Sequence, residues 1–217
     1  GSGDLRLAIT IATATLIITC PCALGLAVPS EMISASGALF RQGVLLKDGT
    51  ALERMADVDI VVLDKTGTLT TGTPELIGRV RRDALALAGT LGAASAHPLA
   101  EAPVPFRFAD TPRPGLETML RGLKAAGCEL VLLSGDAEAP VRRMAEEYGI
   151  AEAHAAMTPQ SKQAYVRDLT AAGHKVLMIG DGMNDTAALV AADVSISPAS
   201  GMDVTRTAAD ILLMRPD

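Results

Sequence analysis

Aromatic residues are scarce in this sequence, which has three Phe, two Tyr and no Trp among its 217 residues. Proteins that bind single-stranded nucleic acids stack bases on exposed aromatic rings, so such a platform is not expected here. An excess of positive charge is also lacking, because the formal net charge is −6, and phosphate backbones select clusters of Lys and Arg. Three cysteines are too few for a disulfide framework. We therefore predict no nucleic-acid partner and no disulfide-stapled fold.

Charged residues are absent from Leu7 to Ser30, a run of 24 positions. A helix needs about 20 apolar residues to cross a bilayer, so this run predicts one transmembrane helix within residues 4–43, together with its cytoplasmic extension. Two alternatives are less favoured, because the apolar core of a signal peptide is shorter, about 7–15 residues, and a buried helix of this length normally keeps a polar face. Residues 1–3, Gly-Ser-Gly, are typical of an expression tag.

The charges divide the sequence into two parts. The four charged residues among the first 43 cancel, so the whole net charge of −6 lies in residues 44–217. The hydrophobic fraction of 49% excludes a disordered chain. We therefore predict a neutral membrane segment followed by an acidic folded body that begins near Val44.

Cys20, Pro21 and Cys22 stand together inside the apolar run, in the stretch LIITCPCALGLAVP. Proline removes a backbone hydrogen bond and opens the turn before it, and broken backbone at membrane depth is tolerated where it faces protein or a cavity. Two thiolates beside such a break suit Cu(I) and, less selectively, Zn(II). Alternatively, Cys20 and Cys22 pack as small apolar residues. For Cys128, which stands elsewhere in the sequence, we favour such packing in the core. At Cys20 and Cys22 we favour the metal site.

After the apolar run, short apolar stretches alternate with helical patterns. Strands are predicted at Ile60–Leu63, Leu130–Leu133, Val176–Ile179, Val194–Ile196 and Ile211–Leu213, and helices at Pro114–Ala126, Ala139–Tyr148, Ser161–Ala172 and Asn184–Ala191. Buried strands that alternate with helices form parallel sheets covered on both faces. We therefore predict an α/β fold, a Rossmann-like parallel sheet, over residues 44–69 and 110–217, with a connector over residues 70–109.

Carboxylates follow three of these strands, at Asp64, Asp136 and Asp181, and the carboxyl ends of parallel strands are where binding sites gather. The stretch DKTGTLT places Asp64 before a hydroxyl-rich turn, which suits a nucleophile that receives a phosphoryl group. The stretch GDGMND supplies carboxylates for Mg²⁺, which prefers oxygen ligands. Each stretch alone has an ordinary explanation as a turn, but their joint occurrence at successive strand ends favours phosphoryl transfer.

Together, DKTGTLT, SGD, TPQSK and GDGMND resemble the phosphorylation-domain motifs of P-type ATPases, within the haloacid-dehalogenase-like superfamily. CPCALGLAVP resembles the metal-path helix of their heavy-metal subclass, and GLAVP resembles copper pumps more than zinc or cadmium pumps. VSISPASGMDVTRTAADILLM is similar to the copper ATPases that serve cytochrome oxidase maturation. The resemblance implies an ATP-driven Cu(I) transporter in a bacterial-type inner membrane, with a cytoplasmic phosphorylation domain and with Mg²⁺ and ATP as cofactors.

The same resemblance implies roles for individual residues. Asp64 would form the aspartyl-phosphate, and Cys20 and Cys22 would bind the transported copper ion. Mg²⁺ would be held by Asp64, the carbonyl of Thr66 and Asp181, with support from Asn184 and Asp185. The other catalytic residues would be Lys65, Thr68, Ser134, Gly135 and Lys162, and the nucleotide side would include His97, Asp110 and Asp136. Asp110 and Arg113 also match the family's hinge segment.

Thr66 separates a pump from its phosphatase relatives. In those phosphatases the residue two after the nucleophile is usually an Asp that acts as general acid and base. A threonine hydroxyl cannot deprotonate water near neutral pH. The sequence therefore predicts a phosphoenzyme that persists until another domain hydrolyses it.

Residues 70–109, only 40 positions, stand where the family inserts a complete nucleotide-binding domain. A "TGE" actuator motif is absent from the sequence, as are the further membrane helices that complete an ion path. The implied partners are therefore the bilayer and the missing helices, actuator and nucleotide domains of a parent pump. Two alternatives stay open: a membrane-tethered phosphotransfer or phosphatase domain of the same superfamily, and an inactive truncated relic.

Overall fold

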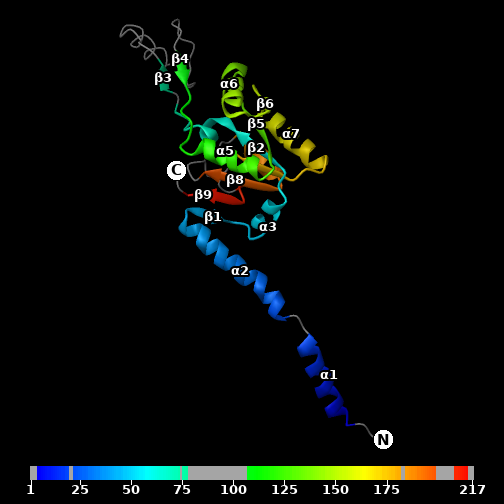
Figure 1. Ribbon diagram of the computed structural model, residues 1–217. Helices are drawn as coiled ribbons and strands as arrows, with labels where there is room; N and C mark the ends of the chain where they lie inside the picture. Colours follow the sequence, from blue (N-terminus) through cyan, green and yellow to red (C-terminus); the bar gives the residue numbers. More distant parts are fainter. Residues whose placement is uncertain are drawn as a thin grey trace.

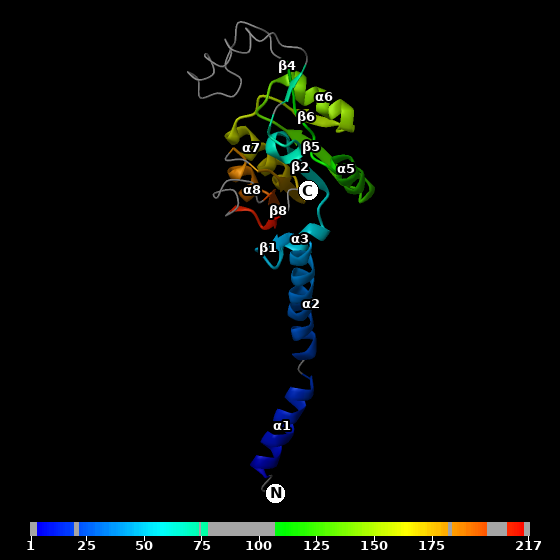
Figure 2. The ribbon, with the colours of Figure 1, turned by 90° about the vertical axis from the view of Figure 1, so that its left-hand side faces the viewer.

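A computed structural model describes residues 4–19, 22–73, 75–77, 107–181, 184–198 and 208–214, without the side chains of residues 19, 22–28, 75–77 and 107–109. Two helices in succession form an arm at the N-terminal end, and an α/β body follows them (Figure 1). The same arrangement is seen after a quarter turn (Figure 2), so the arm leads away from the body in both views.

The apolar run forms two helices, α1 (Leu5–Thr19) and α2 (Cys22–Arg41), where the sequence predicted one. Proline has no backbone N–H and disfavours helical geometry in the residue before it. Pro21 therefore gives a reason for one helix to end and another to begin at this point. Within the described residues, no helix combines the length and the apolar character that crossing a membrane requires.

Seven strands form the main sheet, in the order β1-β9-β8-β7-β2-β5-β6. The five predicted strands are present as β2 (Ile60–Asp64), β5 (Glu129–Leu133), β7 (Val176–Ile179), β8 (Val194–Pro198) and β9 (Ile211–Leu213). These strands and β6 (Glu152–His154) run parallel, which confirms the predicted α/β class. The sequence missed β6 and the edge strand β1 (Val44–Leu46), which pairs antiparallel with β9.

Helices cover both faces of this sheet. The short helix α3 (Ala51–Ala56), α5 (Leu116–Ala125) and α6 (Glu138–Tyr148) pack on one face, and α7 (Pro159–Ala171) and α8 (Thr186–Ala191) pack on the other. Strand β2 is buried along its whole length, and its side chains alternate between the two hydrophobic clusters. Asp64, the last residue of β2, is therefore held by packing from both sides.

A separate two-stranded sheet consists of β3 (Glu75–Ile77) and β4 (Arg107–Ala109), paired antiparallel. The connector predicted for residues 70–109 thus carries a strand near its start and another at its end. The sequence missed them because each has only three residues and begins with a charged one, Glu75 or Arg107, so neither shows a continuous apolar run. This ribbon lies at the end of the body opposite to α2 (Figure 1).

Candidate functional site

Strand β2 delivers Asp64 to the carboxyl edge of the sheet, where a tight turn, η1 (Lys65–Leu69), begins. Gly67 lies inside this turn with a φ angle of +77°, a conformation that favours glycine. The N–H of Thr70 closes the turn by donating to the carbonyl of Lys65 at 3.1 Å. Asp64 itself is only 5% exposed, so the predicted nucleophile is a buried carboxylate at a fixed position.

Helix α7 supplies the cation that faces Asp64. Thr158 caps this helix, because its hydroxyl accepts from the N–H of Ser161 at 3.1 Å, and Pro159 occupies the first turn. Lys162 follows in the same turn and is 2% exposed. Its Nζ donates to Oδ1 of Asp64 and, at 2.7 Å, to Oδ1 of Asp185. One buried ammonium group therefore bridges two buried carboxylates.

Three carboxylates meet at this edge of the sheet. Asp181 follows β7, Asp185 precedes α8, and an oxygen from each lies within 4.8 Å of an oxygen of Asp64 and of one another. Gly67 makes room for them, because a Cβ at that position would lie 1.7 Å from Oδ2 of Asp181. The expected approach of Asp64 and Asp181 is therefore present, and it depends on a glycine that the sequence analysis did not single out.

The carboxylate cluster holds more negative than positive charge. Burial raises the pKa of Asp64 to about 7; the neighbouring Asp185 adds to this effect and Lys162 opposes it. Burial and Asp185 also raise the pKa of Asp181, against the charge of Arg113. Burial alone would lower the pKa of Lys162, but the two carboxylates that it bridges reverse this, and the net shift is upward. A single buried lysine does not neutralise three carboxylates.

These residues fit a magnesium ion. Mg²⁺ takes carboxylate oxygens and keeps several waters, and the oxygens of Asp64, Asp181 and Asp185 are close enough to share one cation. A divalent charge there would also relieve the repulsion that raises the pKa of Asp64 and Asp181. Thr66 and Asn184, both expected to assist, line the same cavity of about 790 Å³.

Lys65 is fully buried but does not face the carboxylate cluster. Its Nζ donates to the carboxylates of Asp110 and Asp136, and the hydroxyl of Thr66 donates to the same carboxylate of Asp136 at 3.0 Å. Burial would lower the pKa of Lys65, yet these two carboxylates raise it, so the lysine stays charged. Lys65 therefore ties the η1 turn to the end of β5 and to the segment that returns from β4.

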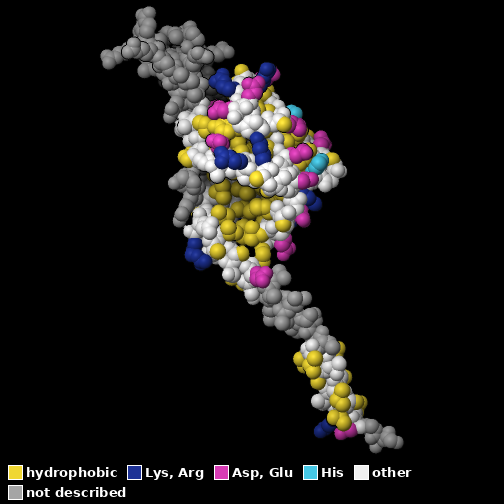
Figure 3. Space-filling view, in the orientation of Figure 1, with side chains coloured by type: hydrophobic (Ala, Val, Ile, Leu, Met, Phe, Trp, Pro, Cys, Tyr) yellow, Lys and Arg dark blue, Asp and Glu magenta, His cyan; other side chains and the backbone are white. Residues whose placement is uncertain are grey.

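Two hydroxyl residues predicted to be catalytic, Ser134 and Thr68, are not among the residues that line the cavity of the carboxylate cluster. The hydroxyl of Ser134 accepts from the N–H of Asp136 at 3.1 Å and closes a turn, and it is Gly135 that lines the cavity of the carboxylate cluster. Thr68 lines a separate apolar cavity of about 420 Å³, and its hydroxyl has no hydrogen-bond partner among the described residues. Hydrophobic side chains surround this hollow between α5 and β1 (Figure 3).

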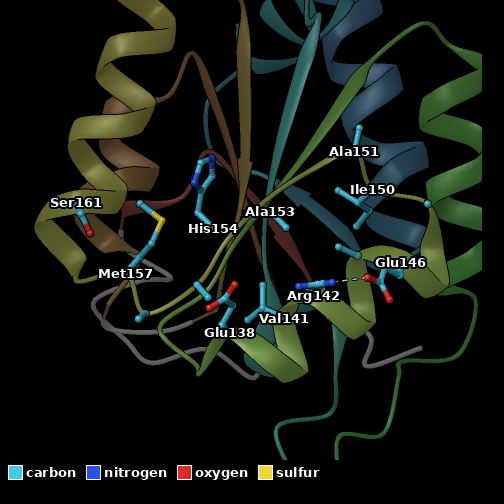
Figure 4. A pocket seen from close by; sticks show the side chains of 14 residues that line it. Glu138, Val141, Arg142, Glu146, Ile150, Ala151, Ala153, His154, Met157 and Ser161 are labelled. Atoms are coloured by element: carbon cyan, nitrogen blue, oxygen red, sulfur yellow. Dashed lines mark hydrogen bonds and ion pairs between the residues drawn. The ribbon is translucent and has the colours of Figure 1, made fainter.

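A larger cavity, of about 920 Å³, lies between α6 and the edge strand β6. Val141, Arg142 and Glu146 of α6 face it from one side and His154 and Met157 from the other, and Arg142 pairs with Glu146 (Figure 4). None of the three clustered carboxylates lines this cavity. Chemistry rather than volume therefore identifies the candidate site as the smaller cavity beside Asp64.

Three residues of the predicted sites cannot be placed. Cys20 and His97 lie outside the described residues, and Cys22 begins α2 with its side chain outside the description. Asp110 is placed, and it contacts Lys65. The copper pair and the place of His97 on the nucleotide side therefore stay predictions.

Comparisons with known proteins agree with this geometry. The family described as "Hydrolase: haloacid dehalogenase-like hydrolase" matches residues 104–193. "Nitrogen fixation protein FixI" of Rhizobium meliloti (strain 1021) is 36% identical over 98% of this chain, and "Copper-transporting P-type ATPase" of Rhizobium leguminosarum bv. viciae is 32% identical over 95%. The chain spans about a third of both relatives, 36% and 34% of their lengths. The first alignment extends over 275 positions, more than the 217 residues of this chain, so this relative has residues that the chain lacks within the matched region.

Two solved structures share the fold. The catalytic domain of the CPx-ATPase CopB-B superposes with a TM-score of 0.73 at 30% identity, covering 84% of this chain and 95% of that domain. A zinc-transporting PIB-type ATPase in an E2.Pi state superposes with a TM-score of 0.79 at 27% identity, covering 93% of this chain and 46% of the pump. The first similarity includes nearly all of a domain of known class.

Proposed function

Because the chain belongs to the heavy-metal (CPx-type) P-type ATPases, we propose that it forms the metal-path and phosphorylation segments of an ATP-driven Cu(I) pump. One observation carries the proposal: Asp64, Lys162, Asp181 and Asp185 converge at the carboxyl ends of β2 and β7 and the starts of α7 and α8. That arrangement offers a buried nucleophile, a fixed ammonium group and oxygen ligands for a cation in one place.

In the proposed reaction an oxygen of Asp64 attacks the terminal phosphorus of ATP. A P–O bond to the carboxylate forms as the P–O bond to the departing ADP breaks, which yields an aspartyl-phosphate and ADP. Lys162, kept protonated by its carboxylate partners, places a positive charge beside the attacking carboxylate. Mg²⁺ held by Asp64, Asp181 and Asp185 would supply charge neutralisation between two negatively charged reactants.

The position of Thr66 supports a pump rather than a phosphatase. Its hydroxyl donates to Asp136, which in turn accepts from Lys65, so both partners are already engaged. Lys65 also holds the pKa of Asp136 below its ordinary value, against the effect of burial. A carboxylate with a lowered pKa is a weak general base. Hydrolysis of the phosphoenzyme would then need a group from another domain.

The N-terminal arm supports the proposed membrane location. Helix α1 exposes large apolar side chains over its length, namely those of Leu5, Leu7, Ile9, Ile11, Leu16, Ile17 and Ile18. The hydroxyls of Thr10 and Thr15 donate at 2.8 Å to the carbonyls of the residues four positions earlier. Polar groups satisfied within the helix are what a bilayer requires. We propose that α1 and the start of α2 lie in the membrane, with Cys22 as the first residue of α2.

Phosphorylation with acetyl phosphate and Mg²⁺ tests the catalytic half of the proposal, because a small donor needs no adenine pocket. We expect label on Asp64, and weak labelling by ATP because residues 70–109 are too few for a full nucleotide domain. Asp64→Asn should abolish labelling by either donor, since an amide is a far weaker nucleophile. Asp57→Asn, at an exposed aspartate at the end of α3, is the matched control and should label normally.

Copper binding tests the transport half. Cys20→Ser with Cys22→Ser should remove high-affinity Cu(I) binding in detergent, measured by titration against a competing chelator, and should leave labelling of Asp64 unchanged. Two sulfurs suffice for Cu(I), whereas Zn(II) usually takes four ligands. Equal Cu(I) retention by both proteins would make the cysteines ordinary apolar residues. Tighter binding of Zn(II) than of Cu(I) by the wild type would reverse the metal assignment.

A further inference from the structure

The segment that returns from β4 runs antiparallel to the residues that leave the η1 turn. The N–H of Thr71 donates to the carbonyl of Thr111 at 2.9 Å, and the N–H of Arg113 donates to the carbonyl of Leu69 at 2.9 Å. Thr70 and Pro112 form an antiparallel bridge between these two bonds. The backbone of Arg113 is therefore fixed relative to the turn that follows Asp64.

The side chain of Arg113 reaches back into the same turn. Its Nη2 donates to the carbonyl of Gly67 at 2.7 Å. Gly67 is the residue whose Cα lies against the carboxylate of Asp181 and whose φ angle is +77°. Arg113 therefore holds the turn at two points, Leu69 through its backbone and Gly67 through its side chain.

Arg113 also borders two cavities. Arg113 and the following Pro114 line both the cavity beside Asp64 and the apolar cavity beside Thr68. The carbonyl of Gly67 therefore accepts from a charged donor. A peptide plane in a glycine turn rotates at low cost, and a charge-assisted hydrogen bond from a neighbouring segment restricts that rotation.

We propose that Arg113 is a positioning residue for the cation site: by holding the Gly67 carbonyl, it keeps the turn in the conformation that lets Asp181 lie against Gly67 and share a cation with Asp64. This inference rests on the proposed Mg²⁺-dependent phosphorylation of Asp64. Arg113 itself touches neither the phosphoryl donor nor the cation in this role. Its contribution is the geometry of the carbonyl that it binds.

Two variants and one control test this role in the full chain, in detergent. Arg113→Met removes the hydrogen bond, and Arg113→Lys keeps the charge but loses the planar guanidinium. Arg54→Met is the control, because Arg54 bonds Asp48, Asp210 and the carbonyl of Asp193 in a cluster that joins α3 to β8 and β9. The first measurement is thermal unfolding against Mg²⁺ concentration with no donor present, and the second is labelling by acetyl phosphate against Mg²⁺ concentration.

We expect Arg113→Met to raise the Mg²⁺ concentration for half-maximal effect about tenfold in both measurements, the size of one charge-assisted hydrogen bond. Saturating Mg²⁺ should restore most of the labelling, and Arg113→Lys should recover only part of the loss. Arg54→Met should lower the unfolding temperature without moving the Mg²⁺ dependence. If Arg113→Met does not fold, Arg113→Lys carries the test.

Unchanged half-saturation in Arg113→Met would overturn the inference. Wild-type behaviour of Arg113→Lys would also overturn it, because positive charge alone would then be sufficient. An equally large shift of the half-saturating Mg²⁺ concentration in Arg54→Met would also overturn the inference, because Arg113 would then act only through general stabilisation of the fold. Absence of label on Asp64 in the wild type would instead contradict the proposed function, and the unfolding measurement would still report on Arg113.

Discussion

Gly67→Ala is the sharpest test of the carboxylate cluster, because the fold contains a matched control. Gly67 has a φ angle of +77° and Gly115, the residue before α5, has one of +78°. A Cβ at Gly115 would meet nothing within 4 Å, whereas a Cβ at Gly67 would lie 1.7 Å from Oδ2 of Asp181. The two alanine variants therefore share the same backbone strain, and only one of them collides with a proposed ligand.

The expected magnitudes follow from that difference. An alanine in the left-handed region costs about 1–2 kcal/mol, partly offset by about 0.4–1 kcal/mol from the restricted unfolded chain. Both variants carry this change. Gly67→Ala adds an overpacking cost of about 1–3 kcal/mol. The new Cβ would lie 1.7 Å from Oδ2 of Asp181, whereas non-bonded atoms normally stay about 3.5 Å apart. Asp181 must move to relieve it, and misplacing a catalytic group by ~1 Å costs about 100-fold in rate.

Urea unfolding and acetyl phosphate labelling measure the two effects separately. Gly67→Ala should be less stable than Gly115→Ala by about 1–3 kcal/mol, and it should label about 100-fold more slowly. Gly115→Ala should label at the wild-type rate once its fold is confirmed by circular dichroism. Equal stability and equal labelling of the two variants would refute the close approach of Asp181 to Gly67.

Three further predictions concern charge. Lys162→Met leaves Asp64 and Asp185 without the cation that bridges them, so the free energy of unfolding should fall by about 3–5 kcal/mol at pH 8. The loss should be smaller at pH 6, where Asp64 takes up a proton, because its pKa is already raised to about 7 with Lys162 in place and rises further without that cation; urea unfolding at both pH values checks this. Without divalent cations, Asp64 should reduce stability as the pH rises from about 4 to 7, because the folded carboxyl keeps its proton up to about 7 and the unfolded one loses it near 3.8. Asp64→Asn should remove that slope, and a wild-type slope in the variant would show that another group titrates. Mg²⁺ should raise the unfolding temperature more at pH 8 than at pH 6, since protons compete for the same oxygens.

Much of the sheet was predictable because its central strands are continuous apolar runs between turn residues. Strand β2 and its neighbours β5 and β7 are buried from end to end or nearly so, and such strands carry a strong signal in sequence. The missed strands β1, β3, β4 and β6 have three residues each. At that length local composition is a weak guide and pairing with a neighbour weighs more, although β9, also three residues long, was predicted from its apolar run.

The candidate site was also predictable in part. The meeting of Asp64 with Asp181 follows from the rule that strand ends share one edge of a parallel sheet. The partners of Lys65 do not follow from any local pattern, because Asp110 reaches it only through the path of the segment returning from β4. The direction of Thr68 was also beyond the sequence, since the dihedral angles of η1 are irregular and set which way each side chain points.

The two-stranded sheet of β3 and β4 is a place where domains of different size can be inserted into the chain. Ile77 and Arg107 face each other across this antiparallel pair, and such partners lie only about 5 Å apart. A domain whose own termini are close together can be spliced between them without stretching either strand. The pairing from Thr70 to Pro112 then separates the splice point from the carboxylates. Domains of different size inserted at this point would leave the carboxylate cluster and its sheet unchanged.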